Sequence, residues 1–221
     1  SKALLHKIGI TQVSLSGDTR FDRVLEIKAA VKALPLVEQF IGKAQVLVAG
    51  STWPQDEMLL KTHMARHPDW KLILAPHEID ESHLNQISAL FPSAAKYSTL
   101  DGGDLNAQVL IIDNIGLLSS LYQYGKMAYI GGGFGAGIHN TLEAAAFGIP
   151  IIFGPNFKKF QEAKDLVALH AAKSISNEAE LEQAFANFGI DKLAGKKAGD
   201  YVFTKKGSTA GIPLAIKPYL N

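Results

Sequence analysis

The chain has 221 residues, enough for one large domain or two small ones, and its 47% hydrophobic and 19% charged content is ordinary for a globular protein. A net charge of +1 excludes the strongly basic balance of most nucleic-acid-binding proteins, so we expect no nucleic-acid partner. The lack of cysteine excludes disulfides, a thiolate nucleophile and a cysteine zinc site; no apolar run approaches the roughly 18 residues of a membrane span, so we expect a soluble chain.

Helical patterns and apolar strand patterns alternate along the first half of the chain. We expect, in order, a short strand at 13–15, a helix at 21–34 that Pro35 ends, strands at 44–49 and 71–75, a helix at 80–91, an edge strand at 95–97 and a strand at 109–112. The aspartate-rich turn at 101–104 lacks the spacing of an EF-hand calcium loop, so we interpret it as a plain turn and expect no metal there.

Two hydroxyl residues, Ser51 and Thr52, follow the strand at 44–49 and precede Pro54. A hydroxyl ahead of a helix with proline in its first turn is a typical N-cap, so one interpretation is that Ser51 or Thr52 caps this helix. The other interpretation is a ligand contact at the end of the strand.

Pro76 and His77 directly follow the strand at 71–75. A lone histidine at the end of a strand is more often structural than functional. Ligands of open α/β sheets nevertheless bind beyond the carboxyl ends of the strands, so we predict that His77 contacts a ligand.

The stretch from Tyr129 to Pro155 organises the rest of the chain. An apolar strand at 127–130 enters a loop with five glycines between 131 and 137, which leads to a short helix and a second strand at 151–153. Glycines between a strand and a helix allow close approach to the backbone, and the helix N-terminus offers unpaired N–H groups, so we expect a phosphate here.

Three polar residues at the end of this loop are candidate ligand contacts. Asn140 is a favourable N-cap, and Glu143, three residues later, either closes a capping box or binds a pair of ligand hydroxyls. His139 either donates to phosphate when protonated or braces the loop.

Two familiar glycine motifs do not fit this loop. Gly131, Gly133 and Ala136 loosely match the dinucleotide fingerprint, but no acidic residue for the ribose follows about 20 residues later, which disfavours NAD. No Walker-type G-x-x-x-x-G-K-[ST] run occurs, which excludes a P-loop NTPase.

The remaining elements continue the alternation. We expect a helix at 157–171, a strand at 174–176, a helix at 178–188, a solvated lysine-rich helix face at 191–206 and a closing helix at 209–220. Strands alternating with helices predict an α/β fold, a Rossmann-like parallel sheet with helices on both faces.

The central motif resembles a known family. The run Gly137-Ile138-His139-Asn140-Thr141-Leu142-Glu143, followed by Ala146, Gly148, Pro150, Gly154 and Pro155, is similar to the 3-deoxy-D-manno-octulosonic acid (Kdo) transferases of lipopolysaccharide synthesis. More generally it resembles the C-terminal, donor-binding half of GT-B glycosyltransferases. The segment from Ser16 to Asp22 resembles the one that joins the two halves of these enzymes.

This resemblance implies a domain organisation. Residues 1–20 would be the interdomain linker or first strand, and residues 21–221 the nucleotide-sugar-binding Rossmann-like domain, without the N-terminal acceptor domain.

The resemblance also implies a binding site for CMP-Kdo. In it Glu143 holds the ribose of CMP, while Asn140 and the loop amides from Gly133 to His139 hold the phosphate. The chain departs from the family at His77, which replaces an arginine, and at Leu117, which replaces a glutamate. The expected donor-binding residues are Ser51, Thr52, Pro76, His77, the backbone of Ile115 and Gly116, Gly133, His139, Asn140, Thr141, Leu142 and Glu143.

The activity implied is the inverting, metal-independent transfer of Kdo from CMP-Kdo to a lipid A precursor, at the cytoplasmic face of the bacterial inner membrane. The general base of the family belongs to the N-terminal half, so we expect no catalytic residue in this chain. We also expect no metal and no cofactor. Contact with the membrane is expected only through the N-terminal half. Two alternatives remain: another transferase or epimerase that uses a UDP-sugar, and a non-catalytic binding module.

Overall fold

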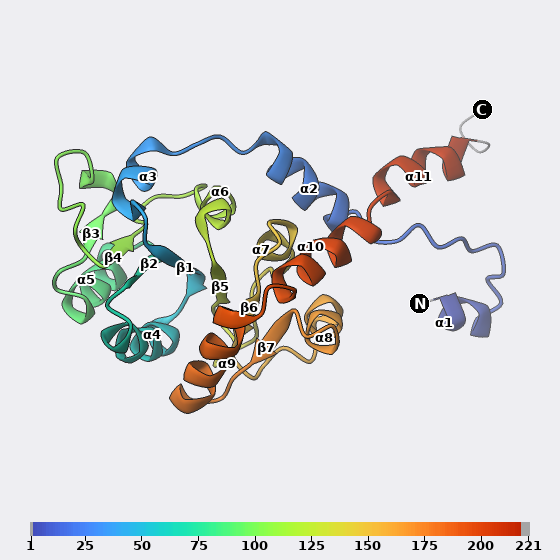
Figure 1. Ribbon diagram of the computed structural model, residues 1–221. Helices are drawn as coiled ribbons and strands as arrows, with labels where there is room; N and C mark the ends of the chain where they lie inside the picture. Colours follow the sequence, from blue (N-terminus) through green and yellow to red (C-terminus); the bar gives the residue numbers. More distant parts are fainter. Residues whose placement is uncertain (1, 218–221) are drawn as a thin grey trace.

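A seven-stranded, fully parallel sheet forms the centre of the computed structural model, which describes residues 2–217 (Figure 1). The strand order is β3-β4-β2-β1-β5-β6-β7. The strands are β1 (Gln45–Thr52), β2 (Trp70–Pro76), β3 (Ala95–Lys96), β4 (Val109–Ile111), β5 (Met127–Ile130), β6 (Ile151–Phe153) and β7 (Ala172–Ser174). The predicted Rossmann-like sheet is therefore confirmed.

Helices cover both faces of this sheet. One face is packed by α2 (Arg20–Ala30), α3 (Pro35–Ile41), α6 (Leu118–Leu121), α7 (Leu142–Ala146), α8 (Gln161–Ala168) and α10 (Ala194–Thr204). The other is packed by α4 (Pro54–Arg66), α5 (Glu81–Leu90) and α9 (Glu178–Ile190). Helices α1 (Lys2–Lys7) and α11 (Ser208–Ile216) extend away from the sheet (Figure 1). Within residues 2–217, no helix has the length and apolar character needed to cross a bilayer.

Strand β1 shows how the sequence builds the two cores. Successive side chains of a strand point to opposite faces. Accordingly, Val46 and Val48 pack on the α2 side, whereas Leu47 and Ala49 pack on the α4 side. Both faces are buried, which explains why the strand is an unbroken apolar run.

The strand order reverses between β1 and β5. From β1 the chain builds outward through β2 to β4 and β3, and from β5 it builds in the other direction through β6 and β7. In open parallel sheets, the crevice beyond the carboxyl ends of the strands at such a reversal is where ligands bind.

Two predictions near the N-terminus were wrong. Pro35 begins α3 rather than ending the preceding helix, because proline at the first helical position loses no hydrogen bond and has the φ that a helix needs. Helix α2 ends at Ala30 instead. The segment 13–15 is not a strand, since the described sheet offers it no partner strand and three residues gain nothing without one.

Predictions in the C-terminal third need smaller corrections. Helix α8 begins at Gln161, and the last strand lies at 172–174. Helix α10 is not merely a solvated face, because Ala198, Tyr201 and Val202 are buried against α2 and α7. The closing helix is described to Ile216, and the predicted end at 218–220 lies outside the described residues.

Glycines of the loop after β5 allow the chain to approach itself. A Cβ on Gly131 would collide with the backbone of Ser51 at the end of β1, and one on Gly133 would lie 2.6 Å from Cα of Gly154 after β6. These glycines therefore serve close packing of three strand ends.

We predict that Gly133→Ala destabilises the protein by about 1–3 kcal/mol, because the two facing backbones cannot yield to a methyl group. The matched control is Gly135→Ala in the same loop, whose Cβ would meet nothing nearer than 3.7 Å. It should stay within about 0.5 kcal/mol of the wild type. Urea unfolding midpoints measure both, and equal midpoints would contradict the packing argument.

Candidate functional site

The carboxyl ends of β1, β2 and β5 form the candidate site. Ser51 and Thr52 end β1, Pro76 ends β2 with His77 after it, and the glycine loop leaves β5. The amide of His77 donates to the carbonyl of Thr52 at 3.0 Å, which joins the first two strand ends.

Ser51 has a backbone conformation that is rare for its residue type. Its φ is 54°, in the left-handed region, and the β1–β2 register shifts between Gly50 and Thr52 at this bulge. Non-glycine residues in this region are uncommon and cluster at functional sites.

Neither Ser51 nor Thr52 caps α4. The N-cap is Trp53, whose amide donates to Asp56 Oδ2 at 3.0 Å, so the capping interpretation was wrong. Ser51 and Thr52 are the last two residues of β1, and α4 begins only at Pro54. The Thr52 hydroxyl instead donates to the carboxylate of Glu57 at 3.0 Å.

Asp56 is a buried carboxylate with three donors. Its Oδ1 accepts from the Tyr129 hydroxyl at 2.7 Å, and its Oδ2 accepts from the amides of Trp53 and Gly132. A buried carboxylate is stable only when its oxygens are hydrogen-bonded. Burial and this carboxylate together raise the pKa of Tyr129, so the phenol stays protonated and keeps donating.

Glu57 forms a second buried polar group behind the site. It contacts His83 Nε2 at 3.1 Å, and His83 Nδ1 donates to the carbonyl of Glu78 at 3.0 Å. Burial raises the pKa of Glu57, although its hydrogen bonds with His83 and Thr52 oppose the rise. This network fixes the start of α5 against α4.

Three rings stack at the mouth of the site. The centroid of His77 lies 4.9 Å from that of Trp53 and 4.2 Å from that of His139. Trp53 Nε1 donates to His139 Nε2 at 3.1 Å, which requires a lone pair on that nitrogen. Burial, with a contribution from the charge of His77, lowers the pKa of His139. The structure therefore favours the neutral, bracing form of His139.

The glycine loop uses several of its own amides. The N–H groups of Gly135 and Gly137 donate to the carbonyl of Gly132, and that of His139 donates to the carbonyl of Gly131. The amide of Ile138 donates to Asn156. These amides are already bonded within the chain, so only the other amides of residues 133–139 are left for the expected phosphate contacts.

The start of α7 orients the carboxylate of Glu143. Its Oε1 accepts from Asn140 Nδ2 at 2.9 Å and its Oε2 from the Ser119 hydroxyl of α6 at 2.8 Å. The N-cap of α7 is Thr141 rather than the expected Asn140. Asn140 Oδ1 still accepts from the amide of Leu142 at 3.0 Å, without the expected capping box. The Thr141 hydroxyl is buried and has no partner among residues 2–217.

Ile115 and Gly116 lie on the loop between β4 and α6. The side chain of Ile115 is 87% exposed, and Gly116 has a φ of 92°. This loop leads into α6, whose Ser119 hydroxyl donates to the carboxylate of Glu143. Leu117, at the position of the family's glutamate, packs partly into the core.

A cavity of about 470 Å³ opens beside the glycine loop. Its lining includes Trp53, Asp56, Gly132, Phe134 and His139. Glu143 is not part of this lining.

Sequence comparison identifies relatives of this chain. A Kdo transferase of Aquifex aeolicus is 32% identical over 148 residues, covering 63% of this chain and 40% of that protein. One from Rickettsia prowazekii is 30% identical over 183 residues (79% and 39%), and one from Haemophilus influenzae is 27% identical over 191 (80% and 44%). This chain belongs to the Kdo transferase family. It spans about two fifths of the length of these relatives, and no family model matches it.

Solved structures support the assignment of the fold. The C-terminal CMP-Kdo binding domain of WaaA from Acinetobacter baumannii matches with a TM-score of 0.64 at 16% identity, over 83% of this chain and 97% of that one. A UDP-N-acetylglucosamine 2-epimerase matches with a TM-score of 0.60 at 15% identity, over 90% of this chain and 49% of that one. The fold is thus that of the C-terminal domain of a GT-B glycosyltransferase, as the resemblance implied.

The structure brings the predicted residues together in two groups. Ser51, Thr52, Pro76, His77 and His139 meet at the ends of β1, β2 and the glycine loop. A second group, which comprises Asn140, Thr141, Leu142 and Glu143, lies at the start of α7, beside the loop that holds Ile115 and Gly116.

Sequence reasoning did not select Trp53, Asp56 or Ser119 as site residues. The only available signal was their place: Trp53 and Asp56 directly follow a strand end, and Ser119 follows the Ile115–Gly116 loop.

We predict that Trp53→Phe raises the pKa of His139, because it removes a hydrogen bond that only the neutral ring can accept. Titration of the His139 imidazole by NMR measures this, with Trp70→Phe, which changes the other tryptophan, as the control. In the wild type the midpoint should lie below the usual histidine value of about 6.5. The stabilising contribution of neutral His139 is then present above about pH 6.5 and is lost as the pH falls towards the folded-state pKa. An unchanged or lower pKa in Trp53→Phe would refute the hydrogen bond.

Proposed function

We propose that this chain is the donor-binding domain of a glycosyltransferase that moves Kdo from CMP-Kdo to a lipid A precursor. The observation that carries the proposal is the Glu143 carboxylate, held ready at the start of α7 within the Kdo-transferase motif. Membership of the Kdo transferase family and the match to a CMP-Kdo binding domain support this donor.

In this proposal Glu143 binds the ribose hydroxyls of CMP. Its two oxygens already accept from Asn140 and Ser119, so the carboxylate is oriented before a ligand arrives. Each carboxylate oxygen has more than one lone pair, which leaves acceptor capacity for two hydroxyl groups. Pre-orientation lowers the entropic cost of binding.

The phosphate of CMP lies beside the loop end in the same proposal. Asn140 and Thr141 supply polar groups, and the loop amides that do not bond within the chain supply N–H donors. Helix α7 has only five residues, so local hydrogen bonds rather than a long helix dipole stabilise the charge that grows on departing CMP.

His77 occupies the position of the family's arginine, and in this proposal its imidazole ring faces the nucleotide. Its stacking on Trp53 and His139 offers a flat surface in place of a permanent charge. Stacking on such a surface tolerates any base, so discrimination between bases would come from other contacts, including the backbone of Ile115 and Gly116.

The complete enzyme would be inverting and metal-independent and would act at the cytoplasmic face of the bacterial inner membrane. Deprotonation of the acceptor hydroxyl needs a general base, which the resembled family places in its N-terminal half. Acceptor and membrane contacts belong to that half in this proposal.

We predict that the protein binds CMP in preference to UMP, GMP and AMP by calorimetry. Loss of the charge-assisted hydrogen bonds in Glu143→Ala should cost about 1.5–3 kcal/mol, roughly ten- to hundredfold in affinity. The matched control, Glu26→Ala, removes an exposed glutamate of α2 and should bind CMP like the wild type. Preference for UMP would instead favour a UDP-sugar enzyme, and binding of none of the four nucleotides would favour a non-catalytic module.

We also predict that this chain alone transfers no Kdo from CMP-Kdo to a lipid A precursor, because it lacks the general base. Mass spectrometry of the lipid after incubation measures transfer. Kdo-modified lipid above the no-protein control would show that the base is on this chain.

A further inference from the structure

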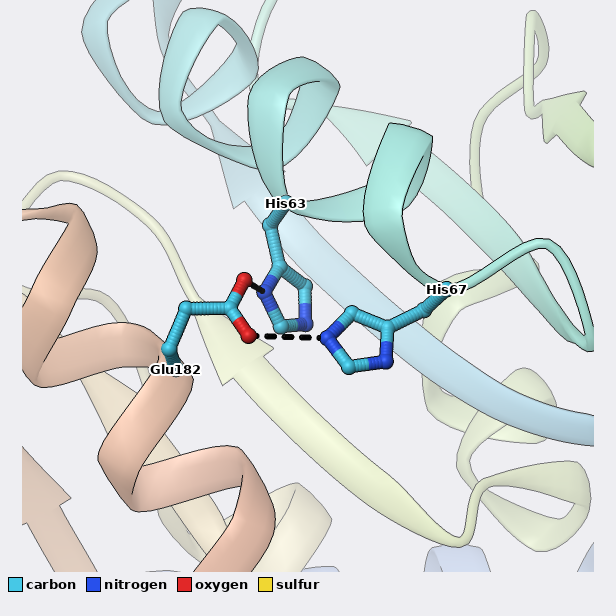
Figure 2. Close-up of side chains that lie close together, drawn as sticks. All are labelled: His63, His67 and Glu182. Atoms are coloured by element: carbon cyan, nitrogen blue, oxygen red, sulfur yellow. Dashed lines mark hydrogen bonds and ion pairs between the residues drawn. The ribbon is translucent and has the colours of Figure 1, made fainter.

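Two histidines and one glutamate gather far from the candidate donor site. His63 lies in the last turn of α4, and His67, four residues later, directly follows the end of this helix. Their ring centroids are 4.4 Å apart, so both side chains lie on the same side of the helix end. Glu182 faces them from α9 (Figure 2). Its Oε1 lies 2.6 Å from His63 Nδ1, and its Oε2 lies 2.9 Å from His67 Nε2.

The location separates this cluster from the donor site. His63 is nine residues from Pro54, so it lies about 14 Å along the helix axis from the end of α4 that carries Trp53 and Asp56. The inference therefore does not depend on the proposed function.

His63 contains an unsatisfied buried atom. Its side chain is fully buried, and its Nε2 has no hydrogen-bond partner among residues 2–217. When Nδ1–H donates to Glu182, Nε2 carries an unshared lone pair. Such a buried atom calls for a partner that is not part of the chain, such as a water or an ion.

The cluster has a route for an ion to enter. His67 and Glu182 are 25% and 28% exposed, so the group is open to solvent on one side. Phe185 closes the other side, with its ring centroid 4.4 Å from that of His63 and 4.7 Å from that of His67. An apolar wall behind three polar ligands is the usual setting of a protein metal site.

The ligand atoms are close enough for one ion. One atom from each of the three side chains can be chosen so that all lie within 4.8 Å of one another. Around a tetrahedral Zn²⁺, with bonds of about 2.0–2.2 Å, ligand atoms are about 3.4 Å apart. The contact of 2.9 Å between His67 Nε2 and Glu182 Oε2 would therefore open by about 0.5 Å, while His63 Nδ1–H keeps its bond to Glu182 Oε1 and Nε2 is the ligand atom of His63.

We propose that His63, His67 and Glu182 bind one divalent ion of the Zn²⁺ class, which links α4 to α9. Two imidazoles and one carboxylate favour zinc, cobalt, nickel or copper over magnesium and calcium, which prefer all-oxygen sites. His63 presents the lone pair of Nε2 to the ion and keeps its ring proton on Nδ1, where it donates to Glu182. His67 presents the lone pair of its Nε2, with its ring proton on Nδ1. A water molecule takes the remaining position.

Arg66 opposes the ion and gives the proposal a directional test. Its Nη1 lies 3.9 Å from Glu182 Oε1, so its positive charge repels a cation at this site. If Arg66 acts through its charge, its removal strengthens metal binding. If Arg66 only holds the structure together, its removal does not strengthen metal binding.

The experiment titrates metal-free protein with Zn²⁺ by calorimetry and with Co²⁺ by absorption spectroscopy, using Mg²⁺ as the negative control. We expect one equivalent of Zn²⁺ to bind and the Co²⁺ spectrum to be that of a four-coordinate site. His67→Ala and Glu182→Gln should each weaken binding by at least the roughly 10–100-fold that loss of a group supporting a ligand causes. Arg66→Gln should tighten it.

The matched control is His170→Asn, an exposed histidine outside the cluster, at which asparagine tolerates the φ of 55°. It should bind Zn²⁺ like the wild type. Circular dichroism of each variant checks that it is folded, and His67 is a partly exposed position where truncation is tolerated. Zn²⁺ binding that survives His67→Ala would place the ion elsewhere, for example at the His77–His139 stack, and would overturn the proposal. So would the absence of stoichiometric binding by the wild type.

Discussion

The buried carboxylate of Asp56 holds together the segments on which the candidate site depends. It accepts from the amide that begins α4, from the hydroxyl of Tyr129 in β5 and from an amide of the glycine loop. Burying the Asp56 carboxylate without hydrogen bonds would cost free energy. The carboxylate and its three donors therefore hold one another in place. The position of the loop relative to β1 follows from this one group.

Around Asp56, close backbone packing completes the arrangement. Gly131 touches Ser51 at the end of β1, and Gly133 touches Gly154 at the end of β6. The glycines that sequence analysis assigned to a ligand are thus used first by the protein itself. In the donor site proposed above, ligand contact would therefore depend on the polar residues after the loop, above all Asn140 and Glu143, which are hydrogen-bonded to each other.

Much of the fold was predictable because local signals agree with the tertiary structure. Apolar runs that end at glycine or proline marked β1, β2 and β5, and Asp80 and Asn177 cap α5 and α9. Predictions failed where tertiary packing decides. Proline can either follow one helix or begin the next, and Pro35 begins α3, whose Val37 and Phe40 are buried in the core. The pattern of α10 likewise does not reveal that Val202 is buried. In the site, the strand-end rule placed His77 beside His139, but the Asp56–Tyr129 bond joins residues 73 apart in the chain and no spacing reveals it. The histidine pair at the end of α4 is visible in the sequence, whereas Glu182 lies 119 residues from His63.

The rigid attachment of the glycine loop bears on how a ligand is captured. Its amides bond to its own carbonyls, its backbone is wedged between two strand ends, and Asp56 holds its second residue. A segment fixed in this way is no lid, because folding it over a ligand would break these contacts. If this surface binds a ligand, enclosure of that ligand would have to come from segments other than this loop. Binding of a ligand to this surface should therefore change the heat capacity only slightly, because little apolar area is buried. The larger heat-capacity change that accompanies the ordering of a loop should not be seen.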